Sequence, residues 1–215
     1  MSEIRIKTMV VGMVATNCYL VYNNETKRAA IVDPGDSAGE IASKCTELGI
    51  KPEAIFLTHG HFDHMMAAGE LKERYKIPVI ACEKELDLLS DGRKNLVENY
   101  FRQPFSLKPD RTVKEGDVVE AAGFSWKVLE TPGHTIGSCC YYIESEHVLF
   151  SGDTLFQLSY GRTDLPTGSG RSMVGSVTRL LRELPEDTQV FPGHMDSTTI
   201  GFEKTHNPLA RFLTV

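Results

Sequence analysis

The 215-residue chain predicts an α/β protein with more than one sheet. Apolar segments of strand length alternate with amphipathic segments of helix length near both ends of the chain, whereas short apolar strands dominate the middle. Hydrophobic residues make up 41% of the sequence and charged residues 24%, which is typical of an ordinary globular protein. A chain of this length can bury a sizeable core, and we expect residues 1–215 to form one domain.

The predicted strands are short apolar runs bounded by turn residues. The third strand ends in the turn Asp33-Pro34-Gly35, and Asp33 is either a structural turn residue or a support for the functional site. In chain order, strands are predicted over Arg5–Val11, Cys18–Tyr22, Ala29–Val32, Ala54–Leu57, Val79–Ala81, Val118–Glu120, Ser125–Thr131, Cys139–Ile143, Val148–Ser151 and Gln189–Phe191.

Three helices are predicted from apolar residues that recur every three or four positions. The first covers Ser37–Leu48 and stops at Gly49, a residue that commonly ends helices. The second covers Asp63–Tyr75 and begins with a carboxylate, which suits the dipole at a helix start. The third covers Ser172–Leu184. The stretch 91–114 contains prolines and scattered charges, and we expect an irregular loop over the site there.

Composition excludes several classes of function. The formal net charge is −6 with no long basic run, so nucleic acid is not an expected partner. No apolar run approaches the roughly 18 residues of a membrane span, and the start of the chain does not resemble a signal peptide. The five cysteines include no CxxC pair, which favours reduced, buried thiols in the cytoplasm. We therefore expect a cytoplasmic protein with a small-molecule substrate and no membrane partner; the sequence leaves the oligomeric state open.

A dense group of candidate metal ligands follows the predicted strand Ala54–Leu57. His59, His61, Asp63 and His64 fall within six residues. Imidazole nitrogen and carboxylate oxygen are common ligands of zinc and similar divalent ions. His59 and His61 are two positions apart, so an extended segment directs both imidazoles to one side. Asp63 and His64 start the next helix and can point to a second, adjacent position.

Three further candidates stand just beyond other predicted strands: His134, Asp153 and His194. Glycine next to such residues lets the backbone approach an ion closely, and strand carboxyl ends are where α/β sheets place their sites. One histidine at a strand end is usually a surface residue, but seven candidates at four strand ends are not independent accidents. The pattern predicts a metal site. His147 and His206 lack this context and are expected to be structural or solvent-facing.

With these candidates in this order, the chain resembles the metallo-β-lactamase superfamily, from Asp33 to Gly201. The resemblance implies an αββα sandwich, in which two mixed β-sheets lie face to face with helices outside and metals at one edge. It also implies two metal sites. The first would be held by His59, His61 and His134, the second by Asp63, His64 and His194, and Asp153 would bridge them.

Asp153 narrows the resemblance within the superfamily. Zinc β-lactamases usually carry cysteine or serine at this position, whereas aspartate resembles the glyoxalase II group, the lactonases and related nucleases. The segments Ser151–Phe156 and Gly161–Asp164, and the tail Thr198–Pro208, are similar to short glyoxalase II-like bacterial hydrolases. The resemblance therefore implies hydrolysis of a thioester.

Two departures bear on the substrate. Full-length glyoxalase II enzymes have an additional C-terminal helical domain, and they place a glutathione-binding lysine and tyrosine where Arg162 and Asp164 stand here. We expect Arg162 and Thr163 to contact the substrate, but glutathione is not the expected thiol carrier, because Asp164 cannot replace a tyrosine hydroxyl facing an anionic tail. Met195 stands where a glycine commonly follows the last ligand histidine.

The expected mechanism uses two divalent ions, with zinc as the first expectation and iron or manganese as alternatives. A hydroxide shared by the ions would attack the thioester carbonyl, with Asp63 and Asp153 as the catalytic carboxylates. The first rival is a persulfide dioxygenase with one iron held by His59, His134 and Asp153. The second is a lactonase with the same ligands. A nuclease fits the acidic chain poorly, and a binding module would not need seven ligands around an open site.

Overall fold

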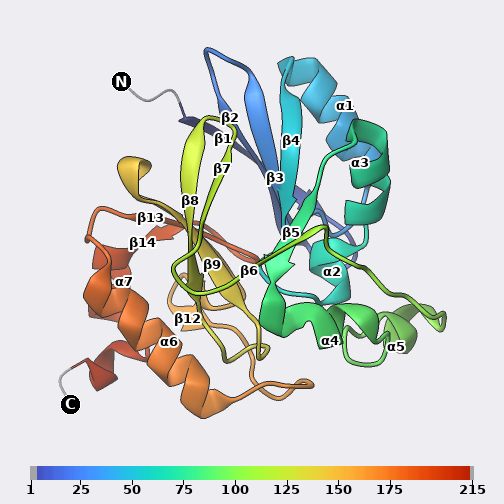
Figure 1. Cartoon of the computed structure of the whole chain (residues 1–215). Coiled ribbons are helices and arrows are strands. Elements are labelled where there is room, and N and C mark those ends of the chain that lie inside the picture. The colour runs from blue at the N-terminus through green and yellow to red at the C-terminus, as the bar shows by residue number, and fades with distance from the viewer. Residues whose placement is uncertain (1–3, 214–215) are drawn as a thin grey trace.

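The computed structural model describes residues 4–213. Two six-stranded sheets lie face to face at its centre, and helices cover both outer faces (Figure 1). This arrangement confirms the predicted α/β class and the αββα sandwich that the resemblance implied.

The first sheet has the strand order β1-β2-β3-β4-β5-β6. Its first three strands are antiparallel neighbours, whereas β3 to β6 run parallel. Parallel neighbours end at the same edge, so the residues that follow β3 and β4 are brought together. The strands are β1 (Ile4–Val11), β2 (Thr16–Asn23), β3 (Arg28–Val32), β4 (Lys51–Phe56), β5 (Val79–Cys82) and β6 (Arg111–Val113).

The second sheet has the order β14-β13-β10-β9-β8-β7. It is also mixed, because β10 and β13 run parallel while the other pairs are antiparallel. A separate ribbon is formed by β11 (Leu155–Phe156) and β12 (Ser159–Tyr160). The strands of the second sheet are β7 (Val118–Ala121), β8 (Phe124–Glu130), β9 (Cys139–Ile143), β10 (Val148–Gly152), β13 (Gln189–Pro192) and β14 (Thr198–Thr199).

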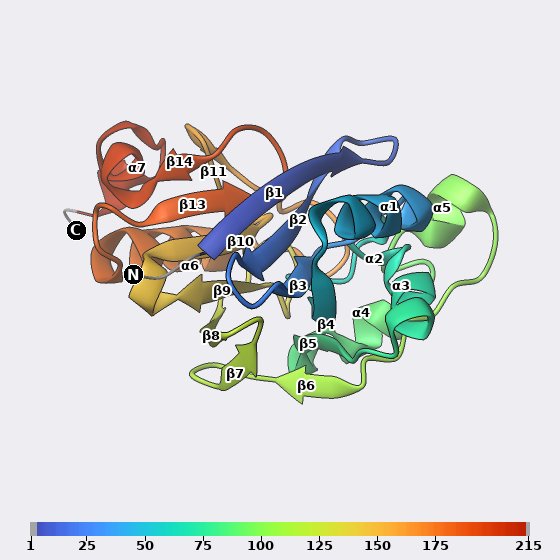
Figure 2. The same ribbon diagram turned by 90° about the horizontal axis from the view of Figure 1, so that it is seen from above.

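The longer helices form the outer layers. Seen from above, α1 and α3 lie beside the first sheet and α6 and α7 beside the second (Figure 2). The α-helices are α1 (Ala38–Leu48), α2 (Phe62–Met65), α3 (Ala68–Tyr75), α4 (Leu86–Ser90), α5 (Val97–Phe101), α6 (Gly170–Glu183) and α7 (Ile200–His206). Three 3-10 turns are η1 (Glu83–Glu85), η2 (Glu144–Glu146) and η3 (Ala210–Phe212).

Aromatic side chains join the two sheets. Along β8, residues alternate between buried and exposed, so Trp126 faces the partner sheet while Ser125 faces solvent. The Trp126 ring stacks between Phe56 of the first sheet, at a centroid distance of 4.5 Å, and Phe150 of the second, at 5.5 Å. Because all three rings are buried, this stack anchors the sheets face to face.

The predicted helix Asp63–Tyr75 is wrong in its continuity, because the chain turns between α2 and α3. The Ala67 amide donates to the carbonyl of Pro34, at 3.0 Å, instead of continuing the helix. The turn at Asp33-Pro34-Gly35 thus supplies the carbonyl that takes the Ala67 amide out of the helical hydrogen-bond pattern. A Cβ at Gly35 would meet the Asp63 carbonyl at 1.4 Å, so only glycine permits this close approach.

The prediction of an irregular stretch over 91–114 is also wrong in part. Val97–Phe101 forms α5, and Arg111–Val113 forms the edge strand β6 paired with β5. This pairing depends on a strand some thirty positions away, so local composition did not reveal it. The stretch does lie over the site, because Leu96 and Tyr100 line the cavity described below.

All five cysteines lie within the described residues, and each is a free, buried thiol, as predicted. Among residues 4–213, none of the helices combines the length and apolar character that crossing a membrane requires.

Candidate metal centre

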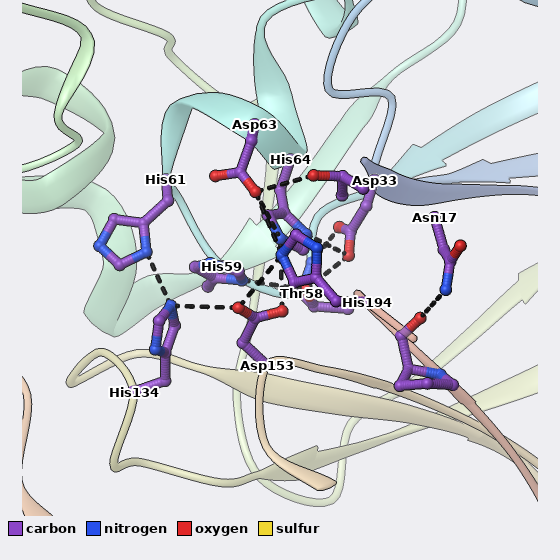
Figure 3. A network of polar contacts seen from close by, with 12 residues as sticks. Asn17, Asp33, Thr58, His59, His61, Asp63, His64, His134, Asp153 and His194 are labelled. Carbon is purple, nitrogen blue, oxygen red and sulfur yellow. Dashed lines mark hydrogen bonds and ion pairs between the residues drawn. The ribbon is translucent and has the colours of Figure 1, made fainter. Parts of the chain in front are cut away.

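All seven predicted ligands converge at one edge of the sandwich (Figure 3). His59 and His61 follow β4, and Asp63 and His64 lie in the first turn of α2. The others follow strands of the second sheet: His134 comes after β8, Asp153 after β10 and His194 after β13. The site is therefore assembled from both sheets.

The ligand atoms form three overlapping groups, each with its atoms within 4.8 Å of one another. The first contains His59, His61 and His134, and the last contains Asp63, His64 and His194. The middle group combines His59 and His64 with Asp153. We call the first group the first half of the cluster and the last group its second half. They match the two metal sites that the resemblance implied, and Asp153 lies between them.

The two oxygens of Asp153 face different neighbours. Oδ1 lies 3.4 Å from His64 Nε2, while Oδ2 lies 3.5 Å from both His134 Nε2 and His194 Nε2. Asp63 Oδ2 lies 3.3 Å from His64 Nε2 and also 3.3 Å from His194 Nε2. Asp153 therefore contacts both halves of the cluster, whereas Asp63 contacts only the second half.

Asp33 orients two of the imidazoles from behind. Its Oδ2 accepts from His64 Nδ1 at 2.9 Å and from the Thr58 hydroxyl at 2.6 Å. Since that hydroxyl donates to Asp33, its oxygen is left to accept from His59 Nδ1, 3.2 Å away. In their neutral form both rings therefore carry their proton on Nδ1, which leaves the Nε2 lone pairs pointing into the cluster. Of the two predicted roles for Asp33, this geometry supports the second.

His134 is oriented by the backbone. Its Nδ1 lies 2.7 Å from the carbonyl oxygen of Arg162, which can only accept, so Nδ1 carries the proton and Nε2 keeps its lone pair in the neutral ring. That Nε2 faces His61 Nδ1 at 2.8 Å. Two ring nitrogens thus meet at the position where the first group could hold an ion.

The electrostatics favour neutral imidazoles on one side of the cluster. Burial, reinforced by the neighbouring histidines, lowers the pKa of His59 well below its usual range. Burial and the charge of His134 lower the pKa of His61 to about 3. Both rings are therefore neutral at physiological pH and can donate a lone pair to a cation.

The other side carries the charges. Burial alone would raise the pKa of Asp63, but His64 and His194 hold it far below its usual range. Burial would also raise the pKa of Asp153, but the charge of His64 outweighs this effect, and the pKa of that carboxyl falls to about 2. Burial would lower the pKa of His64, but Asp63, Asp153 and Asp33 together raise it well above 6.5. Protons and divalent cations would therefore compete for this half of the cluster.

Orphaned polar atoms show that the donor set fits a metal ion. Within residues 4–213, three buried atoms that face the cluster make no hydrogen bond: His59 Nε2, His64 Nε2 and Asp153 Oδ1. Leaving such groups unpaired is costly, and cation coordination satisfies them. Nitrogen and carboxylate donors without thiolates suit zinc, iron or manganese.

Glycines permit the close approach of the loops. A Cβ at Gly193 would lie 2.3 Å from Asp153 Oδ1 and 2.6 Å from His64 Cε1. Gly152 has a φ of +48°, and its Cβ would meet the Thr58 hydroxyl at 2.3 Å. The glycines that precede two ligands are thus required by packing against the cluster.

The cluster forms the floor of a cavity of about 410 Å³. Arg162 lines this cavity, so its predicted contact with substrate stays a prediction, and its guanidinium forms two 2.7 Å hydrogen bonds with the carboxylate of Asp164. Thr163 does not contribute to the described lining, so its substrate contact stays a prediction. His147 pairs with Asp187 and His206 stacks on Phe202, as expected of histidines outside the site.

Sequence reasoning missed several supporting residues. Thr16 donates to Asp63 Oδ2 at 2.8 Å, and Asn17 donates to the carbonyls of Pro192 and Met195. Glu85 is fully buried and accepts from the Gly60 amide at 3.1 Å, between the ligands His59 and His61. Burial raises the pKa of Glu85 to about 7. Glu85 lies among charged residues in the sequence, so the sequence gave no indication that its side chain is buried.

Comparison with known proteins is consistent with this geometry. Residues 11–194 match the family model described as the metallo-beta-lactamase superfamily. A protein of Aquifex aeolicus is 41% identical over 95% of this chain and 96% of its own length. The hydroxyacylglutathione hydrolase GloC of Haemophilus influenzae is 34% identical over 89% of this chain and 91% of its own length.

Solved structures show the same likeness. The BLEG-1 B3 metallo-beta-lactamase superposes with a TM-score of 0.90 at 39% identity, covering 98% of this chain and 100% of its own. TTHA1623 in a di-iron-bound form gives 0.82 at 34% identity, covering 94% and 98%. ETHE1 from Myxococcus xanthus gives 0.77 at 29% identity, covering 95% and 83%. The chain belongs to the metallo-β-lactamase superfamily of metal-dependent hydrolases.

Proposed function

We propose that this protein is a dinuclear metal-dependent hydrolase that cleaves small acyl thioesters. The observation that carries the proposal is the position of Asp153, whose two oxygens face both halves of the cluster. Such a carboxylate is suited to bridge two ions, whereas a single ion would leave half of the donor set unused. Zinc is the proposed metal, with iron or manganese as alternatives.

The proposed ligand sets follow the overlapping groups. His59, His61 and His134 would hold the first ion, Asp63, His64 and His194 would hold the second, and Asp153 would contribute to both. Asp33 and the Arg162 carbonyl act behind these ligands by fixing which imidazole nitrogen faces the ions.

When bound, two divalent ions would act as Lewis acids and would lower the pKa of bound water to about 7. Asp63 lines the cavity, and Thr16 fixes its Oδ2. We assign Asp63 to orient the attacking water through its carboxylate, which the neighbouring histidines keep ionised. A thiol has a pKa of about 8.5, so a thiolate departs without a strong acid from the protein.

The name of one relative supports thioester hydrolysis. GloC carries the name of a thioester hydrolase, whereas TTHA1623 binds two irons and BLEG-1 is named a β-lactamase. The rival reading is a dioxygenase that needs one redox-active iron, which His59, His134 and Asp153 would hold.

Metal-loaded protein decides between these readings. The protein is loaded separately with zinc and with iron in air, and each form receives a small acyl thioester, a lactone, a β-lactam and a persulfide. We expect the zinc form to cleave the thioester without oxygen uptake. Oxygen consumption by the iron form with persulfide, or turnover of only the lactone or β-lactam, would overturn the proposal.

A further inference from the structure

The cavity above the cluster has an apolar wall. We define this wall by six residues that line it: Val14, Leu96, Tyr100, Phe156, Tyr160 and Met195. They come from four separate segments, namely the β1–β2 turn, α5 with the residue before it, the β11–β12 ribbon and the loop after β13. Tyr100 is 53% exposed and Met195 60% exposed, so the wall stays open to a ligand.

Two residues of the wall are held in a backbone conformation that disfavours their side chains. Met195 has a φ of +68° and Leu96 a φ of +71°, in the left-handed region where glycine is preferred. The Met195 carbonyl is fixed by Asn17 Nδ2 at 2.9 Å, and its side chain projects from the fold rather than into a core. Leu96 is buried, but at Met195 the strain is retained for an exposed apolar side chain, which points to a function beyond folding.

Outside the metal centre, the described side chains that line the cavity offer no unpaired cation to an anionic ligand. Apart from the cluster histidines, Arg162 is the one basic side chain among the described lining residues. Asp164 engages its guanidinium in a bidentate ion pair. A ligand carboxylate would have to displace Asp164 in order to pair with Arg162.

We propose, on the basis of the thioester hydrolase function above, that the site selects thioesters whose acyl group and carrier are uncharged and apolar near the scissile bond. The apolar wall buries the acyl chain or the carrier beside the cluster. The ion pair of Arg162 with Asp164 discriminates against carriers with carboxylates, such as glutathione.

A substrate series tests this selectivity in the zinc-loaded protein. Acetyl, butyryl and hexanoyl thioesters of the neutral thiol N-acetylcysteamine are compared with the butyryl thioester of glutathione. We expect kcat/KM to rise by up to about fourfold per added methylene, the effect of burying one CH₂ group. The neutral butyryl thioester should exceed the glutathione thioester by up to about fivefold, since the latter must displace an exposed ion pair. A flat acyl series, or preference for glutathione, overturns the inference.

Two variants test the assigned residues. Met195→Gly relieves the positive φ, so folding should persist, while the hexanoyl-to-acetyl ratio of kcat/KM falls severalfold. Asp164→Asn frees Arg162 and should raise the relative kcat/KM of the glutathione thioester. The control Val118→Thr alters an exposed apolar residue on β7, away from the cavity, and should leave both ratios unchanged. Ratios in Met195→Gly and Asp164→Asn equal to wild type contradict these roles.

Binding without turnover separates this inference from the hydrolase proposal. The non-hydrolysable S-hexyl and S-methyl thioethers of N-acetylcysteamine are titrated calorimetrically into metal-free protein. Tighter binding of S-hexyl, weakened in Met195→Gly, supports the apolar wall even when no thioester is cleaved. Equal binding of the two thioethers overturns it even when thioesters are cleaved.

Discussion

The carboxylate of Asp33 accepts a hydrogen bond from His64 Nδ1 at 2.9 Å, in the fully buried layer behind the cluster. The same carboxylate accepts from the amide and hydroxyl of Thr58, at 2.8 and 2.6 Å. One side chain therefore sets the tautomer of His64 directly and of His59 through Thr58. Asp33 itself has a φ of +50°, which aspartate and asparagine tolerate better than most residues.

The first prediction follows from this contact. Asp33→Asn keeps the shape and tolerates the positive φ but removes the charge that fixes both imidazoles. Zinc affinity, measured by chelator competition, should fall by roughly 10- to 100-fold. The matched control is Asp36→Asn at an exposed position in the same turn, whose zinc affinity should equal that of wild type. Equal affinities for wild type and Asp33→Asn would remove the orienting role.

The second prediction concerns the shared carboxylate. Asp153→Ala removes contacts to both halves of the cluster, so metal content and thioesterase activity should fall together. Metal content is measured by elemental analysis of dialysed protein. Asp164→Ala changes an exposed carboxylate that pairs with Arg162, and its metal content should match wild type. An unchanged metal count in Asp153→Ala would falsify the bridging role.

The third prediction addresses the contact between the sheets. Trp126→Ala removes the central ring of the Phe56–Trp126–Phe150 stack and should lower the free energy of unfolding by about 3–5 kcal/mol. Urea unfolding monitored by circular dichroism provides the measurement. Ser125→Ala, on the exposed face of the same strand, should change the free energy by no more than about 0.5 kcal/mol. Similar losses for both variants would contradict the assignment of the core face.

The convergence of the candidate ligands was predictable because its signal in the sequence is local. Each follows an apolar strand, and strand ends at one edge of a sandwich meet in space, as Asp153 and His194 do. The break between α2 and α3 was not predictable in this way, because it depends on a hydrogen bond from Ala67 to Pro34. The helical period continues through that position in the sequence, and only the folded chain places a competing acceptor there.

Supporting residues were missed for a related reason. Glu85 lies in a run of charged residues that reads as solvent-facing, yet the fold buries it completely. Gly60 donates its amide to Glu85 Oε1, and the loop at Gly137 packs closely against Oε2, where a Cβ would lie 2.3 Å away. Because both contacts come from distant parts of the sequence, neither residue spacing nor composition could predict them.

The fourth prediction uses this buried carboxyl. Burial raises the pKa of Glu85 to about 7 in the folded protein, against an ordinary value of 4.5, although the Thr135 hydroxyl and the Gly60 amide oppose the rise. The fold therefore favours the neutral acid. Its contribution to stability is full below about pH 4.5 and is lost as the pH rises to about 7, a change of roughly 3 kcal/mol.

Glu85→Gln keeps a neutral side chain of the same shape at every pH, so the variant should lack this loss. Urea unfolding of both proteins is measured in chelator between pH 4.5 and 7.5, and the free energy of the variant is subtracted from that of wild type. Titrations of all other groups cancel in this difference. We expect the wild type to lose roughly 3 kcal/mol of unfolding free energy relative to the variant as the pH rises. A difference that is constant over this range would mean that Glu85 is ionised in the folded protein, and the neutral buried acid would have to be abandoned.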